Sequence, residues 1–403
     1  MKILQINSVC GFGSTGKIVT DIHESLIING FDSYVGYGRG EPRHCSKTIK
    51  IGNKYDTYGH VAKTRLTDQH GFGSKRATKT FIKKIQEKNP DLIHLHNIHG
   101  YYLNIGILFD YLKKANKPVV WTLHDCWPFT GHCAYFDYEG CGKWKQGCYD
   151  CPQKANYPSS FLIDNSKSNY FKKKEIFGKV NDLNIITPSK WLAELLNESF
   201  LSEYNITTIN NGIDLELFKP RISEFRNKYQ LKDKFVILGV ASFWEKRKGL
   251  DYFVQLSKIL DENYKIVLIG LKEKEILDLP KNIIALPRTQ NIEELAEVYT
   301  AVDVFVNPTL EDNFPTTNLE SLACGTPVIT FNTGGSIESI NEKCGLIVKN
   351  NEINELYQCI LQIQKNTKQY YSKYCLSQSL NFNKMDVGKK YISIYKSLIE
   401  KGS

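Results

Sequence analysis

The sequence predicts an α/β protein of two domains, each built from parallel strands that alternate with helices. Its 403 residues are long for one domain and sufficient for two, each with its own core. In both halves, short apolar runs rich in β-branched residues end at turn signals and are followed by apolar residues at helical spacing. Its 41% hydrophobic and 24% charged residues are typical of a soluble globular protein.

The first half contains several alternating strand and helix patterns. We expect strands over residues 2–8, 90–96, 118–123, 184–187 and 207–210, and helices over 18–28, 81–88 and 191–201. Residues 41–80 are polar and show little periodicity, so we expect irregular structure there.

The second half repeats the pattern with different residues. We expect strands over residues 235–241, 265–270, 283–286, 303–306 and 328–331, and helices over 250–260, 293–299, 316–324, 353–365 and 387–401. Pro315 opens the helix of the central stretch, and Gly325 with Pro327 ends it.

Acidic side chains mark the central stretch, residues 303–331. Glu311 and Asp312 lie in the loop after a strand, and Glu320 lies on the following helix. Asp312 and Glu320 are eight residues apart, so a loop carboxylate and a helix carboxylate can converge on one polyhydroxylated ligand. The alternative is two solvated acids beside an ordinary α/β turn. Free N–H groups at the helix start, at Thr316 and Thr317, suit a phosphate or sugar oxygen.

This stretch, with its tail ACGTPV, resembles the donor-binding signature of retaining nucleotide-sugar glycosyltransferases of the GT-B fold, family four. The resemblance implies two Rossmann-like domains facing across a cleft, with a C-terminal helix that crosses back to the first domain. The family pattern is Glu, seven residues, Glu, whereas here the first acid in register is Asp312, with Glu311 beside it. The resemblance implies that one of these two acids holds donor-sugar hydroxyls and that Glu320 holds the nucleotide ribose.

The resemblance also divides the chain. Asn211-Gly212-Ile213-Asp214 resembles the family's hinge motif, N-G-[IV]-D. We therefore expect an N-terminal acceptor domain over 1–210 with a Cys-rich insert at 126–152, a hinge over 211–220, a donor-binding domain over 221–385, and a C-terminal helix over 386–403 that docks on the N-terminal domain.

Further donor contacts are expected at three places outside the central stretch: residues 13–16, 247–248 and 288–289. Lys248-Gly249 resembles the family's K-G, whose Lys neutralises the donor diphosphate; Phe243 replaces the usual Arg, a role that Arg247 or Lys246 could assume. The glycine-rich turn after the first strand fits neither a dinucleotide fingerprint nor a Walker loop, and is either a ligand loop or a tight βα connection. The expected donor-binding residues are Gly13, Ser14, Gly16, Arg247, Lys248, Arg288, Thr289, Glu311, Asp312, Asn313, Phe314, Pro315, Thr316, Thr317 and Glu320.

Histidines follow two strands of the first half, where ligands collect in open α/β sheets. His124, with Asp125 beside it, resembles the family's active-site histidine, and Asp125 could orient the imidazole or contact the acceptor. His96, His99 and Tyr101 are acceptor-side candidates; His94 alternates inward toward the core. We expect the catalytic groups to be His124, Asp125, Lys248 and Asp312.

Four cysteines follow at the spacing C-x7-C-x6-C-x2-C: Cys133, Cys141, Cys148 and Cys151. Four thiols including a C-x-x-C suit a closed tetrahedral zinc site that stiffens the acceptor wall without doing chemistry. His132 is a substitute ligand. Unliganded thiols or a redox pair are the alternatives.

The net charge is +9, and basic runs such as Lys172-Lys173-Lys174 concentrate in the first half. They indicate a solvated surface or an anionic membrane as partner. We expect no nucleic acid, because no binding motif accompanies the charge. The chain opens on a strand and not a signal peptide, and no apolar run is long enough to span a bilayer. We therefore expect a cytoplasmic protein with reduced cysteines. Together with the basic first half, this predicts that the protein works at the inner face of the membrane.

We therefore expect a retaining glycosyltransferase that needs no cofactor for catalysis. It would move a sugar from a nucleoside diphosphate sugar to a glycan or lipid-linked acceptor in capsule or O-antigen type polysaccharide synthesis. The alternatives are a sugar-nucleotide 2-epimerase of the same fold and an inactive sugar-binding partner subunit.

Overall fold

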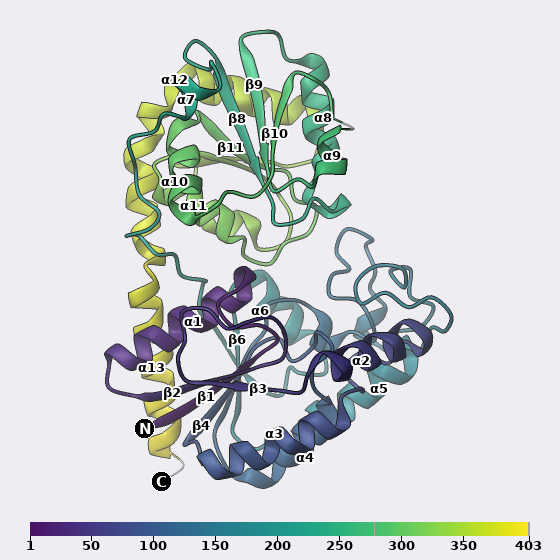
Figure 1. The fold of residues 1–403 in the computed structure, drawn as a ribbon. Helices are drawn as coiled ribbons and strands as arrows, with labels where there is room; N and C mark the ends of the chain where they lie inside the picture. The colour runs from purple at the N-terminus through teal and green to yellow at the C-terminus, as the bar shows by residue number, and fades with distance from the viewer. Residues whose placement is uncertain (278, 402–403) are drawn as a thin grey trace. The chain divides into compact units, whose positions relative to one another are not determined.

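The computed structural model describes residues 1–277 and 279–401, which form two compact units (Figure 1). Unit 1 comprises Met1–Asn210 and the C-terminal segment from Met385, and unit 2 comprises Asn211–Lys384. The predicted end of the first domain at residue 210 coincides with the first boundary. Residues 211–220, predicted as a hinge, belong to unit 2.

Unit 1 is built on a seven-stranded parallel sheet with the order β3-β2-β1-β4-β5-β6-β7. Its strands are β1 (Lys2–Asn7), β2 (Asp32–Tyr37), β3 (Thr48–Lys50), β4 (Leu92–Leu95), β5 (Val119–Thr122), β6 (Leu183–Thr187) and β7 (Asn205–Thr208). Its helices are α1 (Gly13–Ile28), α2 (Lys54–Thr67), α3 (Lys75–Lys88), α4 (Ile105–Ala115), α5 (Ser166–Phe177), α6 (Lys190–Asn197) and α13 (Lys384–Lys401). Every residue of β4 and β5 is buried, as expected for central parallel strands that are covered on both faces.

The C-terminal helix α13 completes the core of unit 1 and lies beside α1 (Figure 1). The Tyr395 hydroxyl lies 2.6 Å from Nδ1 of His94, and the Tyr391 hydroxyl lies 3.2 Å from Oγ1 of Thr122. His94 is therefore a core residue, as its alternation predicts.

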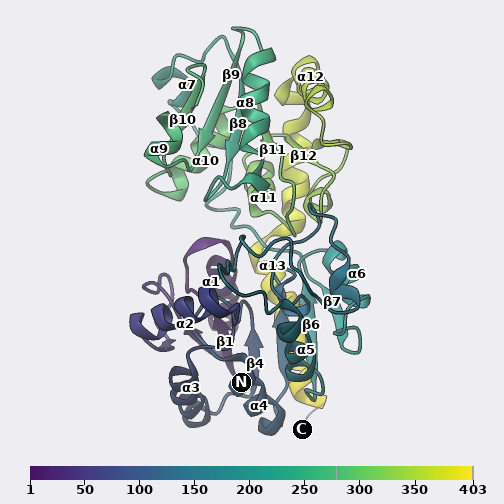
Figure 2. The same cartoon turned by 90° about the vertical axis from the view of Figure 1, so that its right-hand side faces the viewer.

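Unit 2 is built on a six-stranded parallel sheet with the order β10-β9-β8-β11-β12-β13 (Figure 2). Its strands are β8 (Phe235–Val240), β9 (Tyr264–Ile269), β10 (Ile283–Leu286), β11 (Val304–Asn307), β12 (Val328–Phe331) and β13 (Gly345–Val348). Its helices are α7 (Phe225–Lys228), α8 (Leu250–Ile259), α9 (Glu273–Leu277), α10 (Ile292–Ala301), α11 (Thr316–Ala323) and α12 (Ile353–Ser379). A non-helical residue, Thr367, kinks α12 just after the predicted helix ends.

The prediction of irregular structure over residues 41–80 is wrong, because β3, α2 and the start of α3 lie there. Helix α2 has no apolar inward face, since its buried residues are His60 and Thr64. Its start is fixed locally by a capping box: the Asn53 side chain accepts from the Tyr55 and Asp56 amides, and Asp56 accepts from the Asn53 amide. Across the described part of the chain, no helix combines the length and apolar character needed to cross a bilayer.

Candidate functional site

An ion pair lies at the centre of the predicted donor site in unit 2. Lys248, which follows β8, donates its ammonium group to Oδ2 of Asp312, which follows β11. The Asp312 Oδ1 atom accepts a hydrogen bond from the Asn313 amide at 3.0 Å. The loops after two neighbouring strands thus meet through a cation and a carboxylate, as expected at the carboxyl end of a parallel sheet.

Backbone contacts hold these two loops together. The Arg247 carbonyl accepts from the Leu310 amide at 2.7 Å, and Nη1 of Arg247 donates to the Glu311 carbonyl at 3.2 Å. Gly249 has a φ of +74°, and a Cβ there would overlap the Pro308 carbonyl. Only glycine fits this close approach without strain, which explains the Lys-Gly pair.

The charges of the pair are mutually dependent. Burial of Lys248 lowers the pKa of its ammonium group, although Asp312 opposes the shift. Burial acts to raise the pKa of Asp312, but the positive charges of Lys248 and Arg247 outweigh it and hold that pKa below its usual value. The carboxylate is therefore ionised at neutral pH.

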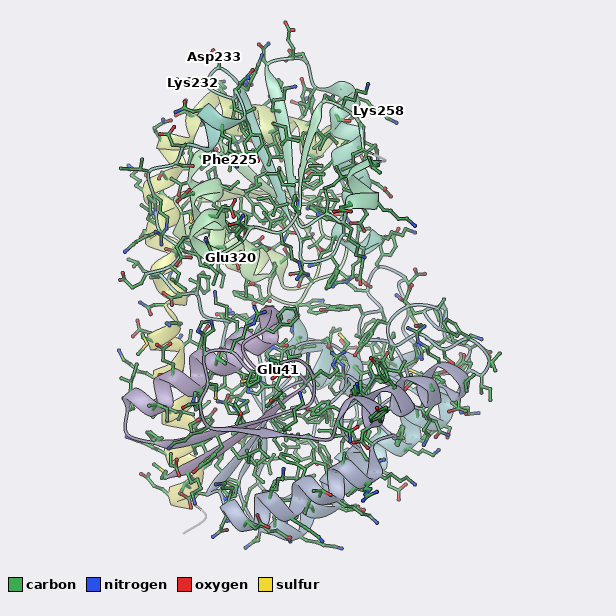
Figure 3. The ribbon with its side chains drawn as sticks, viewed as in Figure 1. Glu41, Phe225, Lys232, Asp233, Lys258 and Glu320 are labelled. Carbon is green, nitrogen blue, oxygen red and sulfur yellow. The ribbon has the colours of Figure 1, made fainter. Side chains whose placement is uncertain are left out.

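Glu320 lies on α11 of unit 2 (Figure 3). Its Oε2 atom accepts a hydrogen bond from the Tyr299 hydroxyl of α10 at 3.2 Å. Sequence reasoning missed Tyr299, because a tyrosine at a helical core position carries no signal of this contact. Burial raises the pKa of Tyr299, so its hydroxyl stays a neutral donor.

Residues 311–314 of the loop before α11 are buried more deeply than is expected of residues that contact a ligand. Glu311, Asn313 and Phe314 are all buried, while Thr316 and Thr317 at the start of α11 are half-buried. The glycine after β12 also contributes: Gly334 has a φ of +53°, and a Cβ there would overlap the Asp312 carbonyl. Asp312 is the acid of the loop that meets Lys248, with Glu311 buried beside it.

Arg288 brings a cation beside Phe243, the residue that follows Ser242 after β8. Its guanidinium lies 4.7 Å from the centre of the Phe243 ring, and Nη2 donates to the Ser242 carbonyl at 2.6 Å. Arg288 and the neighbouring Thr289 follow β10. Arg288 is exposed, and Thr289 is half-exposed.

In unit 1 the predicted acceptor residues form two linked pairs. Nδ1 of His96 lies 3.1 Å from Nε2 of His124, and the two rings stack. Nε2 of His99 lies 2.9 Å from Oδ2 of Asp125, whose Oδ1 accepts from the Trp127 amide at 3.0 Å. The strands β4 and β5 are neighbours, so the residues that follow them meet at one edge of the sheet.

These pairs are buried, and burial sets their charge. Desolvation lowers the pKa of His124 to about 4, so its imidazole is neutral at pH 7. The pKa of Asp125 is lowered because His99 and the Trp127 amide outweigh the cost of burial. The centre of the ring of Tyr101, the remaining acceptor-side candidate, lies 4.6 Å from the centre of the His70 ring. A neutral histidine beside an ionised carboxylate can accept or position a hydroxyl proton.

The glycine-rich turn leads directly into α1. Gly13 and Ser14 are exposed in its first turn, whereas Gly16 is buried and its carbonyl accepts from the Gly11 amide at 3.0 Å. Gly13 and Ser14 can therefore meet a ligand, and Gly16 shapes the turn.

The four cysteines of the insert line one small cavity of about 10 Å³, which Trp144 and Phe136 also border. The Gly131 amide donates to Sγ of Cys148 at 3.1 Å. In the described residues, however, no three or more His, Cys, Asp or Glu side chains are grouped so that they could hold a metal ion. His132 instead binds the carboxylate of Asp68. The thiols gather as the spacing suggests, but their arrangement is not that of a formed zinc site, and zinc stays a prediction.

Comparison with known families decides the class of protein. The family described as "Glycosyltransferase Family 4" matches residues 16–217, and the one described as "Glycosyl transferases group 1" matches residues 234–366. The chain belongs to glycosyltransferase family 4. In this glycosyltransferase the first match contains β2–β7 of the first sheet, the second match contains all six strands of the second sheet, and the fold is the GT-B pair of Rossmann-like domains.

Several relatives of this glycosyltransferase have names that refer to surface polysaccharides. One from Escherichia coli K12, named for colanic acid biosynthesis (WcaC), is 27% identical over 89% of this chain and 90% of its own. The capsular polysaccharide biosynthesis glycosyltransferase CapM of Staphylococcus aureus is 30% identical over 43% of this chain and 50% of its own.

Solved structures share the fold. Sucrose-phosphate synthase from Thermosynechococcus elongatus superposes with a TM-score of 0.74 at 19% identity, covering 99% of each chain. Anabaena HepE in complex with UDP superposes with a TM-score of 0.70 at 16% identity, covering 98% of this glycosyltransferase and 100% of HepE.

Proposed function

We propose that this glycosyltransferase moves a sugar, with its anomeric configuration kept, from a nucleoside diphosphate sugar to a hydroxyl of a lipid-linked glycan. The observation that carries the proposal is the Lys248–Asp312 pair, whose carboxylate lies in the loop that leads into α11, with Glu320 on that helix. A cation, a carboxylate and free helix N–H groups are what a diphosphate and sugar hydroxyls require.

Unit 2 would bind the donor. Lys248 can exchange its carboxylate partner for the donor diphosphate, which leaves the oxygens of Asp312 free for sugar hydroxyls. Glu320, held by Tyr299, would accept hydrogen bonds from the ribose. The nucleotide part is supported by HepE, a protein of the same fold, which has been solved in complex with UDP-glucose.

The reaction would break the bond between the anomeric carbon and the diphosphate oxygen and form a bond from the acceptor oxygen to that carbon on the same face. The acceptor proton would pass to the departing diphosphate. Stabilisation of the diphosphate by Lys248 and helix N–H groups would be the main catalytic effect. Catalysis in this scheme requires no cofactor.

Unit 1 would bind the acceptor through the His96–His124 and His99–Asp125 pairs. An acceptor of the lipid-linked kind is supported by a relative from Escherichia coli. That enzyme is named as a galactosyltransferase acting on GlcNAc-diphosphoundecaprenol and is 28% identical over 42% of this chain and 47% of its own. We place the activity at the inner face of the cell membrane, in surface polysaccharide assembly.

A donor screen tests the proposal. Purified protein would be incubated with UDP- and GDP-sugars, with and without extracted lipid-linked glycans, and diphosphate release would be measured. We expect release with one donor only when acceptor is present, and a product whose NMR coupling shows the anomeric configuration of the donor. An inverted product would refute retention. Isomerised donor without release would identify a 2-epimerase, and no reaction with any donor would indicate an inactive binding subunit.

A further inference from the structure

The outward face of helix α2 is apolar although it faces water. Tyr55, Tyr58, Ala62 and Leu66 are spaced three or four residues apart and are all exposed. At about 100° per residue, they form one stripe along the helix. The buried residues His60 and Thr64 lie on the opposite side. The usual amphipathic arrangement of a surface helix is therefore reversed.

The stripe continues into a second segment. Residues 161–163 form an exposed Phe-Leu-Ile tip, and the Phe161 amide donates to the Arg65 carbonyl of α2 at 2.8 Å. We call the set of Tyr55, Tyr58, Leu66, Phe161, Leu162 and Ile163 the apolar ridge. Each of these side chains is between 46% and 74% exposed. Scattered apolar residues are normal on a surface, but six gathered on one helix face and on the segment hydrogen-bonded to the end of that helix indicate an interaction site.

The inward side of α2 is fully engaged, so the ridge does not result from a loosely packed helix. Nε2 of His60 accepts from the Gly71 and Gly73 amides at 3.1 and 3.2 Å, and Nδ1 lies 3.0 Å from the Ser74 hydroxyl. These bonds, with the capping box, fix which face of α2 points outward. Figures 1 and 2 both show α2 at an edge of unit 1.

Basic side chains flank the ridge. On α2, Lys54 and Arg65 lie about 85° and 65° to one side of the middle of the stripe and Lys63 about 95° to the other. The Arg65 guanidinium lies 5.1 Å from the centre of the Phe161 ring. Lys63 is half-buried, and its Nζ atom donates to the Phe72 carbonyl at 3.1 Å. Burial lowers the pKa of its ammonium group, and the positive charges of Lys75 and Lys172 add to the shift.

An apolar centre with basic margins is the pattern of a segment that lies in a membrane interface. Tyrosine rings suit the headgroup level, Phe, Leu and Ile enter the acyl boundary, and Lys and Arg extend to lipid phosphates. In an isologous contact between two copies, the same basic margins would face each other. The charge therefore favours an anionic bilayer over a second copy.

We propose that the apolar ridge and its basic margins attach this protein peripherally to an anionic lipid bilayer, the ridge entering the headgroup boundary and the exposed Lys54 and Arg65 contacting lipid phosphates. The proposal rests on the proposed function in one respect: a lipid-linked acceptor lies in such a bilayer. The attachment itself does not require the transfer reaction.

Vesicle sedimentation tests the attachment. The full chain would be mixed at low salt with vesicles of phosphatidylcholine alone or with phosphatidylglycerol added. We expect at least tenfold tighter binding to the anionic vesicles, weakened by high salt. The variant Tyr55→Ser/Leu162→Ser should lose at least tenfold in affinity. The control Ile222→Ser, at a 95% exposed position of unit 2, should bind like the wild type.

A charge variant completes the test. Lys54→Gln/Arg65→Gln should remove the preference for anionic vesicles, while Lys258→Gln in unit 2 should keep it. Unchanged melting temperatures would show that the variants fold. Absence of wild-type binding to anionic vesicles, or equal binding by the ridge variant and its control, would overturn the proposal. So would a dimer in light scattering that the ridge variant dissociates, because a second copy would then cover the ridge.

An activity assay separates the two proposals. It measures diphosphate release with the acceptor dispersed in detergent, so that the reaction does not depend on binding to vesicles. If the ridge variant keeps that activity and loses vesicle binding, both stand. If the wild type binds vesicles but releases no diphosphate with any donor, the proposed function fails and the attachment survives.

Discussion

The carboxylate of Asp312 binds the ammonium group of Lys248 across 64 residues of sequence, and each group holds the other in its charged form. A nucleotide-sugar entering this site must compete with Asp312 for the lysine.

Lys248→Ala should weaken binding of a nucleoside diphosphate more than binding of the matching nucleoside. The lost charged hydrogen bond is worth about 1.5–3 kcal/mol. Titration calorimetry with UDP and uridine, or GDP and guanosine, measures both. Lys258→Ala, near the far end of α8 (Figure 3), is the matched control and should change neither. Equal losses for diphosphate and nucleoside would contradict the assignment of Lys248.

Glu320→Ala should lower donor affinity by roughly 1.5–3 kcal/mol, because ribose hydroxyls lose a charged acceptor. Tyr299→Phe removes the hydroxyl that holds Glu320 and should cost less, about 0.5–1.5 kcal/mol. The same calorimetry, with Glu338→Ala as a control, checks both. Unchanged nucleotide binding in Glu320→Ala would remove this residue from the donor site.

Zinc content decides the state of the cysteine cavity. Elemental analysis of protein purified without chelator should give about one zinc per chain if the cavity closes around a metal. Cys148→Ser should then lower the melting temperature before it lowers activity, whereas Cys359→Ser in unit 2 should do neither. A metal-free protein with full activity would refute the zinc prediction.

Acidification should destabilise unit 1 between about pH 6.5 and 4. Burial lowers the pKa of His60 to about 3 and that of His124 to about 4, from an ordinary value of 6.5. In this window the unfolded chain binds more protons than the folded chain, so the free energy of unfolding falls as pH falls. Each histidine contributes up to about 1.4 kcal/mol per pH unit. His132 acts in the opposite direction, because Asp68 raises its pKa.

Melting temperatures at pH 7.5 and 5.5 check this prediction. His60→Gln should reduce the dependence on pH, and His44→Gln, at an exposed position, should leave it unchanged. A melting temperature that is the same at both pH values would show that the buried histidines do not control stability.

Sequence reasoning located the elements whose apolar residues face the core, such as β4, β5 and β11. It missed α2, because the inward residues of that helix are polar and its apolar residues face outward. The motif predicted Asp312 and Lys248 separately, but their contact depends on the pairing of β8 with β11, which no local spacing reveals. For the same reason, Asp125 could not be assigned to His99, a residue that follows the neighbouring strand.

The return of α13 to the first sheet has a consequence for synthesis on the ribosome. His94 and Thr122 receive their hydroxyl partners from Tyr395 and Tyr391, which are translated only after the whole of unit 2. Unit 2 is contiguous and can complete its core before α13 is made, but unit 1 must wait for α13. Contrary to the usual N-terminal-first order, the second unit should become resistant to protease first in stalled nascent chains. A fragment ending at residue 210 should remain an open, aggregation-prone intermediate until the missing helix is supplied.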